Sequence, residues 1–194
     1  MGNNDQDVID AFEGRPLSLS KHAERQIRWV ANKLTASQIL KLKQLPLNTS
    51  AADYFFCHAI ADNNRTIFTP HNDLIKIKSF FQEIKEPFII CGHTHLQFKL
   101  DIGSKIIFNA GSIGMPFSDQ EGAQWLWIED QTFHFKKTIV NKNSAIKSMK
   151  TTDFLFLNEF IETYVKNTVS ISNAYEMLDK LAVEQQIRFR RQNS

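Results

Sequence analysis

The sequence predicts a layered α/β fold, and three observations support this prediction. Apolar residues recur at helical spacing over residues 19–45, short runs rich in aromatic and β-branched residues fill the middle of the chain, and helical spacing returns from about Thr152. With 194 residues the chain fits one domain, and a domain of that size buries roughly 70% of its unfolded surface. A real hydrophobic core is therefore expected.

Two helices are predicted near the start of the chain. The apolar face of the first consists of Ala23, Ile27, Val30, Ala31 and Leu34. Thr35 and Gln38 then have the form of a capping box that opens a second, shorter helix. We expect both helices to cover one face of the sheet, with Ile27 and Leu42 turned inward. The charged residues expected to face solvent are Lys21, Glu24, Arg25 and Lys43.

Five strands are predicted in the middle of the chain, where short apolar runs are bounded by Gly, Asn, Asp and Pro. They span residues 54–57, 88–91, 105–108, 124–128 and 132–140, and a helix over 74–86 separates the first two. Cys57 and Cys91 each end one of these runs, where a free cysteine usually serves as a small buried hydrophobe. Two cysteines are also too few for a disulfide framework.

A last helix is predicted towards the end of the chain. Its face is marked by Ile171, Ala174, Leu178, Leu181 and Ala182. It ends in a polar tail over 188–194 that contains Arg188, Arg190 and Arg191. We interpret this basic cluster as a solvated helix end rather than a nucleic-acid site.

The composition excludes several classes of protein. An apolar fraction of 42% and a charged fraction of 23% are ordinary for a folded globular chain. Lys and Arg number 23 against 21 for Asp and Glu, so no general basic field attracts nucleic acid. No stretch approaches the ~20 apolar residues of a membrane span, and the polar start lacks the features of a signal peptide. We therefore expect a cytoplasmic protein with neither a membrane nor a nucleic acid as partner.

Three histidines directly follow predicted strands. His58 follows the run 54–57, and His93 and His95 follow the run 88–91 after one glycine. Ligands gather at the carboxyl ends of strands in sheets of this kind, and imidazole is a common metal ligand, so a metal site is one interpretation. The other is that the H-x-H pair forms a polar strand face whose rings are satisfied by neighbours. These three residues alone leave both interpretations open.

A turn is predicted where the run 105–108 ends in Asn109-Ala-Gly-Ser. Gly111 permits a positive φ there, and the turn could present backbone amides to a metal site or a phosphate. The alternative is a simple connection between two strands, and the sequence does not separate the two.

Four motifs, taken in order, resemble those of the calcineurin-like metallophosphoesterases, and the small bacterial type most of all. They are Gly2-Asn3-Asn4-Asp5, His58 after an apolar strand, Gly92-His93-Thr94-His95, and Asn109-Ala110-Gly111-Ser112-Ile113-Gly114. The resemblance covers roughly residues 2–140. It implies a two-sheet β-sandwich flanked by helices, with a phosphoesterase domain over 1–150 and a C-terminal helical extension over 151–194.

The resemblance also implies a site and a reaction. Asn3, His58 and His93 match ligands of one divalent metal ion, such as Mn, Fe, Zn or Ni, and His95 matches a ligand of a second ion. The implied reaction is hydrolysis of a phosphomonoester or phosphodiester, with a phosphorylated small molecule or a nucleotide as substrate. Asn4 stands where the family has a histidine that acts as general acid or binds phosphate, and an amide exchanges no proton near neutral pH.

Two motifs of the family, D-x-H and G-D-x-x-D, do not precede Gly2. Because they supply ligands that include the aspartate bridging both ions, we expect an incomplete domain with a partial sandwich and weak or no hydrolysis. A fragment, a truncated gene or a start codon placed too far downstream would each explain this. The leading hypothesis is a metal-dependent phosphoesterase, and the alternative is a non-catalytic module that keeps the fold for a structural or partner-binding role.

Overall fold

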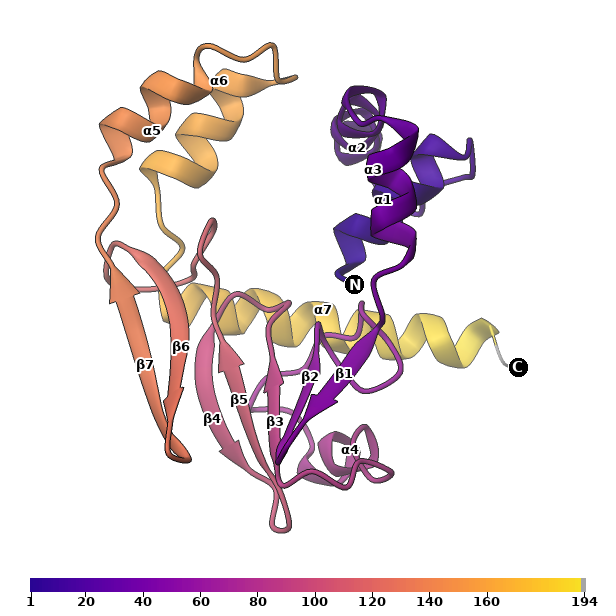
Figure 1. Cartoon of the computed structure of the whole chain (residues 1–194), viewed down its shortest axis with the longest axis vertical. Helices are drawn as coiled ribbons and strands as arrows, with labels where there is room; N and C mark the ends of the chain where they lie inside the picture. Colours follow the sequence, from indigo (N-terminus) through magenta and orange to yellow (C-terminus); the bar gives the residue numbers. More distant parts are fainter. Residues whose placement is uncertain (193–194) are drawn as a thin grey trace.

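A five-stranded sheet with strand order β1-β2-β3-β5-β4 forms the centre of the fold (Figure 1). Its strands are β1 (Asn48–Ala51), β2 (Tyr54–Cys57), β3 (Phe88–Cys91), β4 (Gln97–Asp101) and β5 (Ile106–Ala110). The three inner strands are parallel, and β1 and β4 pair antiparallel at the edges. The computed structural model describes residues 1–192, with side chains up to Ile187, so the cluster Arg188, Arg190 and Arg191 lies outside the described side chains.

The predicted strands agree with this sheet where the sequence is continuously apolar. The runs 54–57 and 88–91 match β2 and β3 at both ends, because parallel inner strands are buried on both faces. The edge strands β1 and β4 were not predicted. The four residues of β1 are polar or small and all exposed, and β4 alternates between buried and exposed positions.

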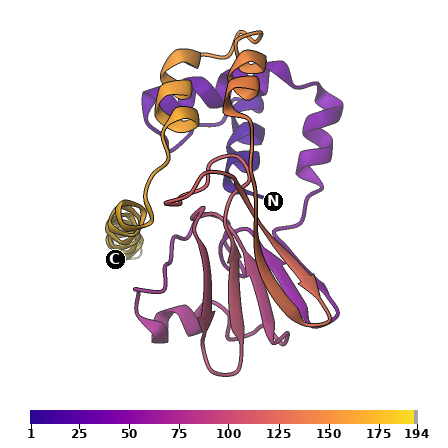
Figure 2. The ribbon, with the colours of Figure 1, turned by 90° about the vertical axis from the view of Figure 1, so that its left-hand side faces the viewer.

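A hairpin of β6 (Ala123–Glu129) and β7 (Thr132–Thr138) forms a second sheet on one face of the first, as Figure 2 shows. Aromatic rings fill the space between the two. The ring of Phe133 stacks on Phe108 with centroids 3.9 Å apart and also lies 4.9 Å from the Phe88 ring. The expected partial two-sheet sandwich is thus confirmed, with two strands in its second sheet.

Helix α7 (Ile171–Gln192) lies on the other face of the five-stranded sheet (Figures 1 and 2). Ala174 and Leu178 enter the same buried cluster as Ile89 and Ile107 of the sheet. Of the predicted apolar face of α7, Ala174, Leu178 and Ala182 are buried, whereas Ile171 and Leu181 are exposed. The boundary at residue 150 stays a prediction.

A second, shorter helix lies near the same face. The sequence predicted a helix over 74–86, but α4 (Leu74–Ser79) is shorter and is followed by turns. Ile77 of α4 and Phe81 just after it are both 1% exposed and belong to the central core.

The helices at the start of the chain lie beyond the end of the sheet where β2 and β3 terminate (Figure 2). They are α1 (Asn3–Phe12), α2 (Lys21–Lys33) and α3 (Ala36–Lys43). The capping box of Thr35 and Gln38 at the start of α3 is confirmed. The expectation that α2 and α3 cover a sheet face is wrong, because they pack on α1, a helix the sequence analysis did not predict.

These three helices have a small core of their own. It is formed by Val8, Ala31 and Ile39, with Ile27 and Leu42 partly buried against it. Both residues therefore point inward as expected, though not towards the sheet. The charged residues Lys21, Arg25 and Lys43 are exposed, while Glu24 is partly buried and pairs with Arg28 at 2.8 Å.

Further helical segments follow the hairpin: α5 (Lys142–Met149), α6 (Leu157–Phe160) and a short π-helix, η1 (Ile161–Lys166). The loop before α6 contacts α2. Phe154 meets Trp29 edge-on at 5.1 Å, and Lys33 forms an ion pair with Asp153 at 2.5 Å. No described helix combines the length and the apolar character needed to cross a bilayer.

Candidate metal centre

Three of the residues predicted as metal ligands meet at the carboxyl edge of the sheet. His58 directly follows β2, and Asn3 begins α1. His58 Nε2 lies 2.9 Å from Asn3 Oδ1 and 3.2 Å from His93 Nδ1. Polar atoms of Asn3 and His93, which are far apart in the sequence, thus both lie against His58 Nε2.

His93 is oriented by the backbone of another segment. Its Nε2 lies 3.1 Å from the carbonyl oxygen of Arg65. Because a carbonyl only accepts hydrogen bonds, this contact requires the proton of the neutral ring to be on Nε2. The lone pair of Nδ1 is then directed at His58. Metal-binding histidines are commonly fixed in this way by a carbonyl behind the ring.

The loop that carries Arg65 is tied to α1. Asn63 Oδ1 accepts hydrogen bonds from the amides of Arg65 and Thr66 at 2.7 and 3.0 Å. The Arg65 guanidinium donates to both carboxylate oxygens of Asp7, at 2.6 and 3.3 Å, and the Asp7 side chain is only 4% exposed. One residue therefore links the helix that begins with Asn3 to the ring of His93.

The backbone of the turn that carries His93 and His95 is strained. His93 and His95 have φ values of 64° and 60°, a region that residues other than glycine rarely adopt. The buried side chain of Asn109 holds this turn by donating to Gly92 O at 2.6 Å and to Thr94 Oγ1 at 2.9 Å. Such strain persists only where the surroundings over-determine the backbone.

The Asn109-Ala-Gly-Ser turn thus has a structural task. Asn109 Oδ1 accepts from the amide of Gly111 at 3.0 Å, and Gly111 adopts a φ of +80°. A Cβ atom on Gly111 would lie 2.4 Å from Gln124 Oε1 and 2.7 Å from Gln97 Cγ. The segment supports the histidine turn through side-chain hydrogen bonds of Asn109.

His95 and Asn4 stand at the margin of the cluster. His95 packs against the ring of Phe117, with centroids 5.6 Å apart, and forms a hydrogen bond with the backbone of Met115. Asn4 is exposed, and its Oδ1 accepts from Asn3 Nδ2 at 3.1 Å. Because Asn4 engages the amide nitrogen of Asn3, the Asn3 oxygen is left facing His58.

Burial keeps the site histidines neutral near pH 7. It lowers the pKa of His93 to about 4, with a further contribution from charge repulsion by His58. Burial also lowers the pKa values of His58 and His95. Neutral imidazole is the form that binds a metal, so burial favours the ligand state of all three rings.

The donor set fits a single divalent cation when the amide oxygen of Asn3 is included. Within the described part of the chain, no three His, Cys, Asp or Glu side chains are grouped so that they could hold a metal. The donor atoms of Asn3, His58 and His93 are spaced by 2.9 and 3.2 Å. Imidazole nitrogens and amide oxygens are both ligands of divalent cations, so these three residues would hold one such ion.

Asp7 and Arg65 support the site without having been predicted, whereas the turn of Asn109 was predicted as one that could adjoin it. The sequence contains a weak indication that Asp7 is buried, since it directly precedes the apolar pair Val8-Ile9, and all three residues are buried in α1. The sequence contains no indication of the role of Arg65. It lies in an irregular loop and contacts His93 through its carbonyl oxygen, a group that every residue has.

Comparison with solved structures identifies the type of fold. No protein-family model and no curated protein matches the sequence. Among solved structures, the hypothetical protein PH1004 from Pyrococcus horikoshii is 12% identical over 87% of this chain and 72% of its own, with a TM-score of 0.69. A metallophosphoesterase from Sphaerobacter thermophilus is 19% identical over 77% of this chain and 69% of its own, with a TM-score of 0.60. The chain therefore has the fold of a metallophosphoesterase.

Proposed function

We propose that the chain is a metal-dependent phosphoesterase whose site, formed by Asn3, His58 and His93, holds one divalent cation. The observation that carries this proposal is the convergence of three neutral donor atoms at 2.9 and 3.2 Å on the edge of a metallophosphoesterase fold. The proposed substrate class is a phosphorylated small molecule or a nucleotide.

The three proposed ligands and the Arg65 carbonyl would have different roles at such a site. A bound divalent cation supplies Lewis acidity and lowers the pKa of a water to about 7. Asn3, His58 and His93 add no charge of their own, so they hold a cation without neutralising it. The Arg65 carbonyl keeps the proton of His93 on Nε2, away from the ligand atom. The ring of His93 is thereby held ready to bind.

His95 is proposed as a ligand of a second ion, held weakly. Within the described residues no carboxylates are grouped with His95 into a metal site. A metallophosphoesterase reaction needs two ions to stabilise both the attacking and the leaving oxygen. We therefore expect tight binding of one ion per chain and hydrolysis close to background by residues 1–194 alone.

Metal titration followed by an activity assay tests the proposal. Isothermal titration with Mn²⁺ and Zn²⁺ should show one tight site, which is lost in His58→Ala and in His93→Ala. The matched control is His134→Ala, which changes a histidine of β7 in the hairpin and should leave metal affinity unchanged. Hydrolysis of bis(p-nitrophenyl) phosphate should be weak and should depend on added metal. Equal metal affinity in all three variants would refute the assignment.

A second candidate function is a non-catalytic module that binds a partner. The observation in its favour is that two acceptors, Asn3 Oδ1 and His93 Nδ1, lie within hydrogen-bond distance of His58 Nε2, which can share one proton between them. A cluster of that kind can be a closed structural network. The metal titration described above distinguishes the two candidate functions, because a closed network binds neither Mn²⁺ nor Zn²⁺ at stoichiometric concentration.

A further inference from the structure

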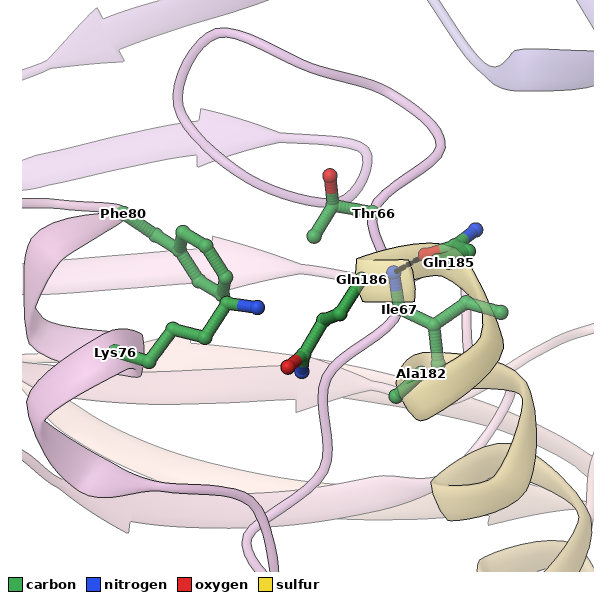
Figure 3. Close-up of a pocket in the computed structure, with 7 residues that line it drawn as sticks. All are labelled: Thr66, Ile67, Lys76, Phe80, Ala182, Gln185 and Gln186. Carbon is green, nitrogen blue, oxygen red and sulfur yellow. Dashed lines mark hydrogen bonds between the residues drawn. The ribbon is translucent and has the colours of Figure 1, made fainter. Parts of the chain in front are cut away.

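Helix α7 reaches the loop behind His93 through one side chain. Both ends of the Gln185 amide are used. Its Oε1 accepts from the Ile67 amide at 3.0 Å (Figure 3), and its Nε2 donates to the Arg65 carbonyl at 2.8 Å. Residues 65 and 67 belong to an irregular segment without a strand partner. Gln185 thus supplies the acceptor and the donor that a neighbouring strand would otherwise provide.

The Arg65 carbonyl oxygen therefore has two donors. Gln185 Nε2 lies 2.8 Å from it and His93 Nε2 lies 3.1 Å from it. A carbonyl oxygen carries two lone pairs, so it can accept from both at once. Gln185 and His93 are thus linked through this one carbonyl oxygen.

The same helix holds the next part of the loop. The Asp179 carboxylate accepts from Thr69 Oγ1 at 2.5 Å, and its other oxygen lies 3.0 Å from His71 Nδ1. Thr69 is fully buried. Leu178 and Ala182 of α7 are buried as well, so the helix cannot slide or rotate to relax these contacts.

We infer that Gln185 is a positioning residue that keeps His93 in the orientation and tautomer needed to bind a metal through Nδ1. The inference rests on the proposed function for the role of His93 as a ligand. It extends the site into α7, which lies outside the stretch that carries the metallophosphoesterase motifs. The connection is two hydrogen bonds long, from the amide of Gln185 to one carbonyl and from that carbonyl to the ring.

Histidine tautomers report this positioning without any metal. In metal-free wild-type protein at pH 7.5, ¹⁵N-resolved NMR of the imidazole rings should show His93 protonated on Nε2. Gln185→Glu keeps an acceptor for Ile67 but places a second oxygen against the Arg65 carbonyl, so the carbonyl should shift and His93 should populate both tautomers. The control is Gln186→Glu, which introduces the same charge at a residue lining the cavity in Figure 3, where no hydrogen bond joins it to the loop. It should keep the wild-type signal.

Metal affinity measures the consequence for the site. Loss of a group behind a metal ligand typically weakens binding by about 10- to 100-fold, and we expect at least the lower value for Zn²⁺ with Gln185→Glu and no change with Gln186→Glu. Gln185→Met removes both hydrogen bonds without adding charge, and it serves if the Glu variant fails to fold in thermal melts.

The outcomes separate the inference from the proposed function. Wild-type protein that binds neither Zn²⁺ nor Mn²⁺ overturns the metal site, and the tautomer measurement then still decides whether Gln185 positions His93. Wild-type protein that binds metal, with the same tautomer and affinity in the Gln185 variants, overturns the inference alone. A loss of metal affinity in the Gln185 variants without any change in the His93 tautomer assigns Gln185 a merely structural role, which also overturns it.

Discussion

His58 Nε2 lies 2.9 Å from Asn3 Oδ1, although 55 positions separate the two residues in the sequence. One atom belongs to the first turn of α1 and the other to the residue after β2. The contact joins the helical layer at the start of the chain to the edge of the sheet.

Replacing Asn3 should separate metal binding from stability. Asn3→Ala removes the only oxygen donor of the proposed ligand set, and we expect Mn²⁺ affinity to fall by at least tenfold. The hydrogen bond to His58 is partly buried, so its loss should lower the free energy of unfolding by only about 1 kcal/mol. Titration calorimetry and urea unfolding of the same samples measure both effects. Unchanged affinity would remove Asn3 from the site.

The metal-free protein should lose stability in mild acid. The pKa of His93 is lowered from 6.5 in the unfolded chain to about 4, so the unfolded state takes up the proton first as the pH falls. Stability from this group is complete above about pH 6.5 and declines until about pH 4, by roughly 1–2 kcal/mol at pH 5. The lowered pKa values of His58 and His95 act in the same direction.

Chelator-treated wild type and His93→Gln should therefore be unfolded with urea at pH 7.5 and at pH 5. Wild type is expected to lose more stability than the variant over this interval, because glutamine does not titrate. An equal loss in both proteins would show that His93 is not the source of the pH dependence.

The ion pair of Asp7 and Arg65 should contribute measurably to stability. Asp7→Asn leaves the arginine without its charged partner, and we expect a loss of about 1.5–3 kcal/mol, since the Asp7 side chain is buried and accepts two hydrogen bonds. The matched control is Glu121→Gln, which removes an exposed pair with Lys142 and should cost less than about 1 kcal/mol. Thermal or urea unfolding compares the two, and similar losses would contradict this account.

Gly111 should not tolerate a side chain. Alanine at this position must keep a φ of +80°, which costs roughly 1–2 kcal/mol, and its Cβ must displace Gln124 and Gln97. The control is Gly114→Ala in the same segment, where the added atom meets nothing within 4 Å. We expect Gly111→Ala to lower the melting temperature clearly and Gly114→Ala to leave it nearly unchanged. The opposite order would mean that the turn adopts another conformation in solution.

Both cysteine thiols should resist modification in the native protein. Burial raises the pKa of Cys57 to about 12, and it raises the pKa of Cys91 well above its ordinary value. Because the thiolate is the reactive form, alkylation by iodoacetamide at pH 8 should be slow when the protein is folded and fast in urea. Mass spectrometry counts the modified residues, and rapid labelling of either thiol in the native state would contradict the assigned burial.

The local sequence was enough to predict the two inner strands β2 and β3 and the start of helix α3. The runs 54–57 and 88–91 predicted β2 and β3 at both ends, because a strand buried on two faces must be apolar throughout. The pair Thr35 and Gln38 predicted the start of α3, because a capping box satisfies the helix end with groups three residues apart. The position of His58 and His93 at the sheet edge follows from the same strands.

Long-range packing decided the rest. The sequence could not show that α2 and α3 pack on α1 instead of the sheet, because an amphipathic pattern specifies an inward face and not the partner that covers it. Nor could it show β1, whose residues are all exposed and join the sheet only through backbone pairing with β2.

The sequence by itself determined which residues we propose as metal ligands and at which end of the sheet His58 and His93 stand. Only the tertiary structure decided which nitrogen of His93 faces His58. That choice depends on the carbonyl of Arg65, 28 positions earlier in the chain, and on Gln185, 120 positions after Arg65. Hydrogen bonds require donor and acceptor within about 3 Å and in line, and a spacing along the sequence carries no information about such distances between remote segments.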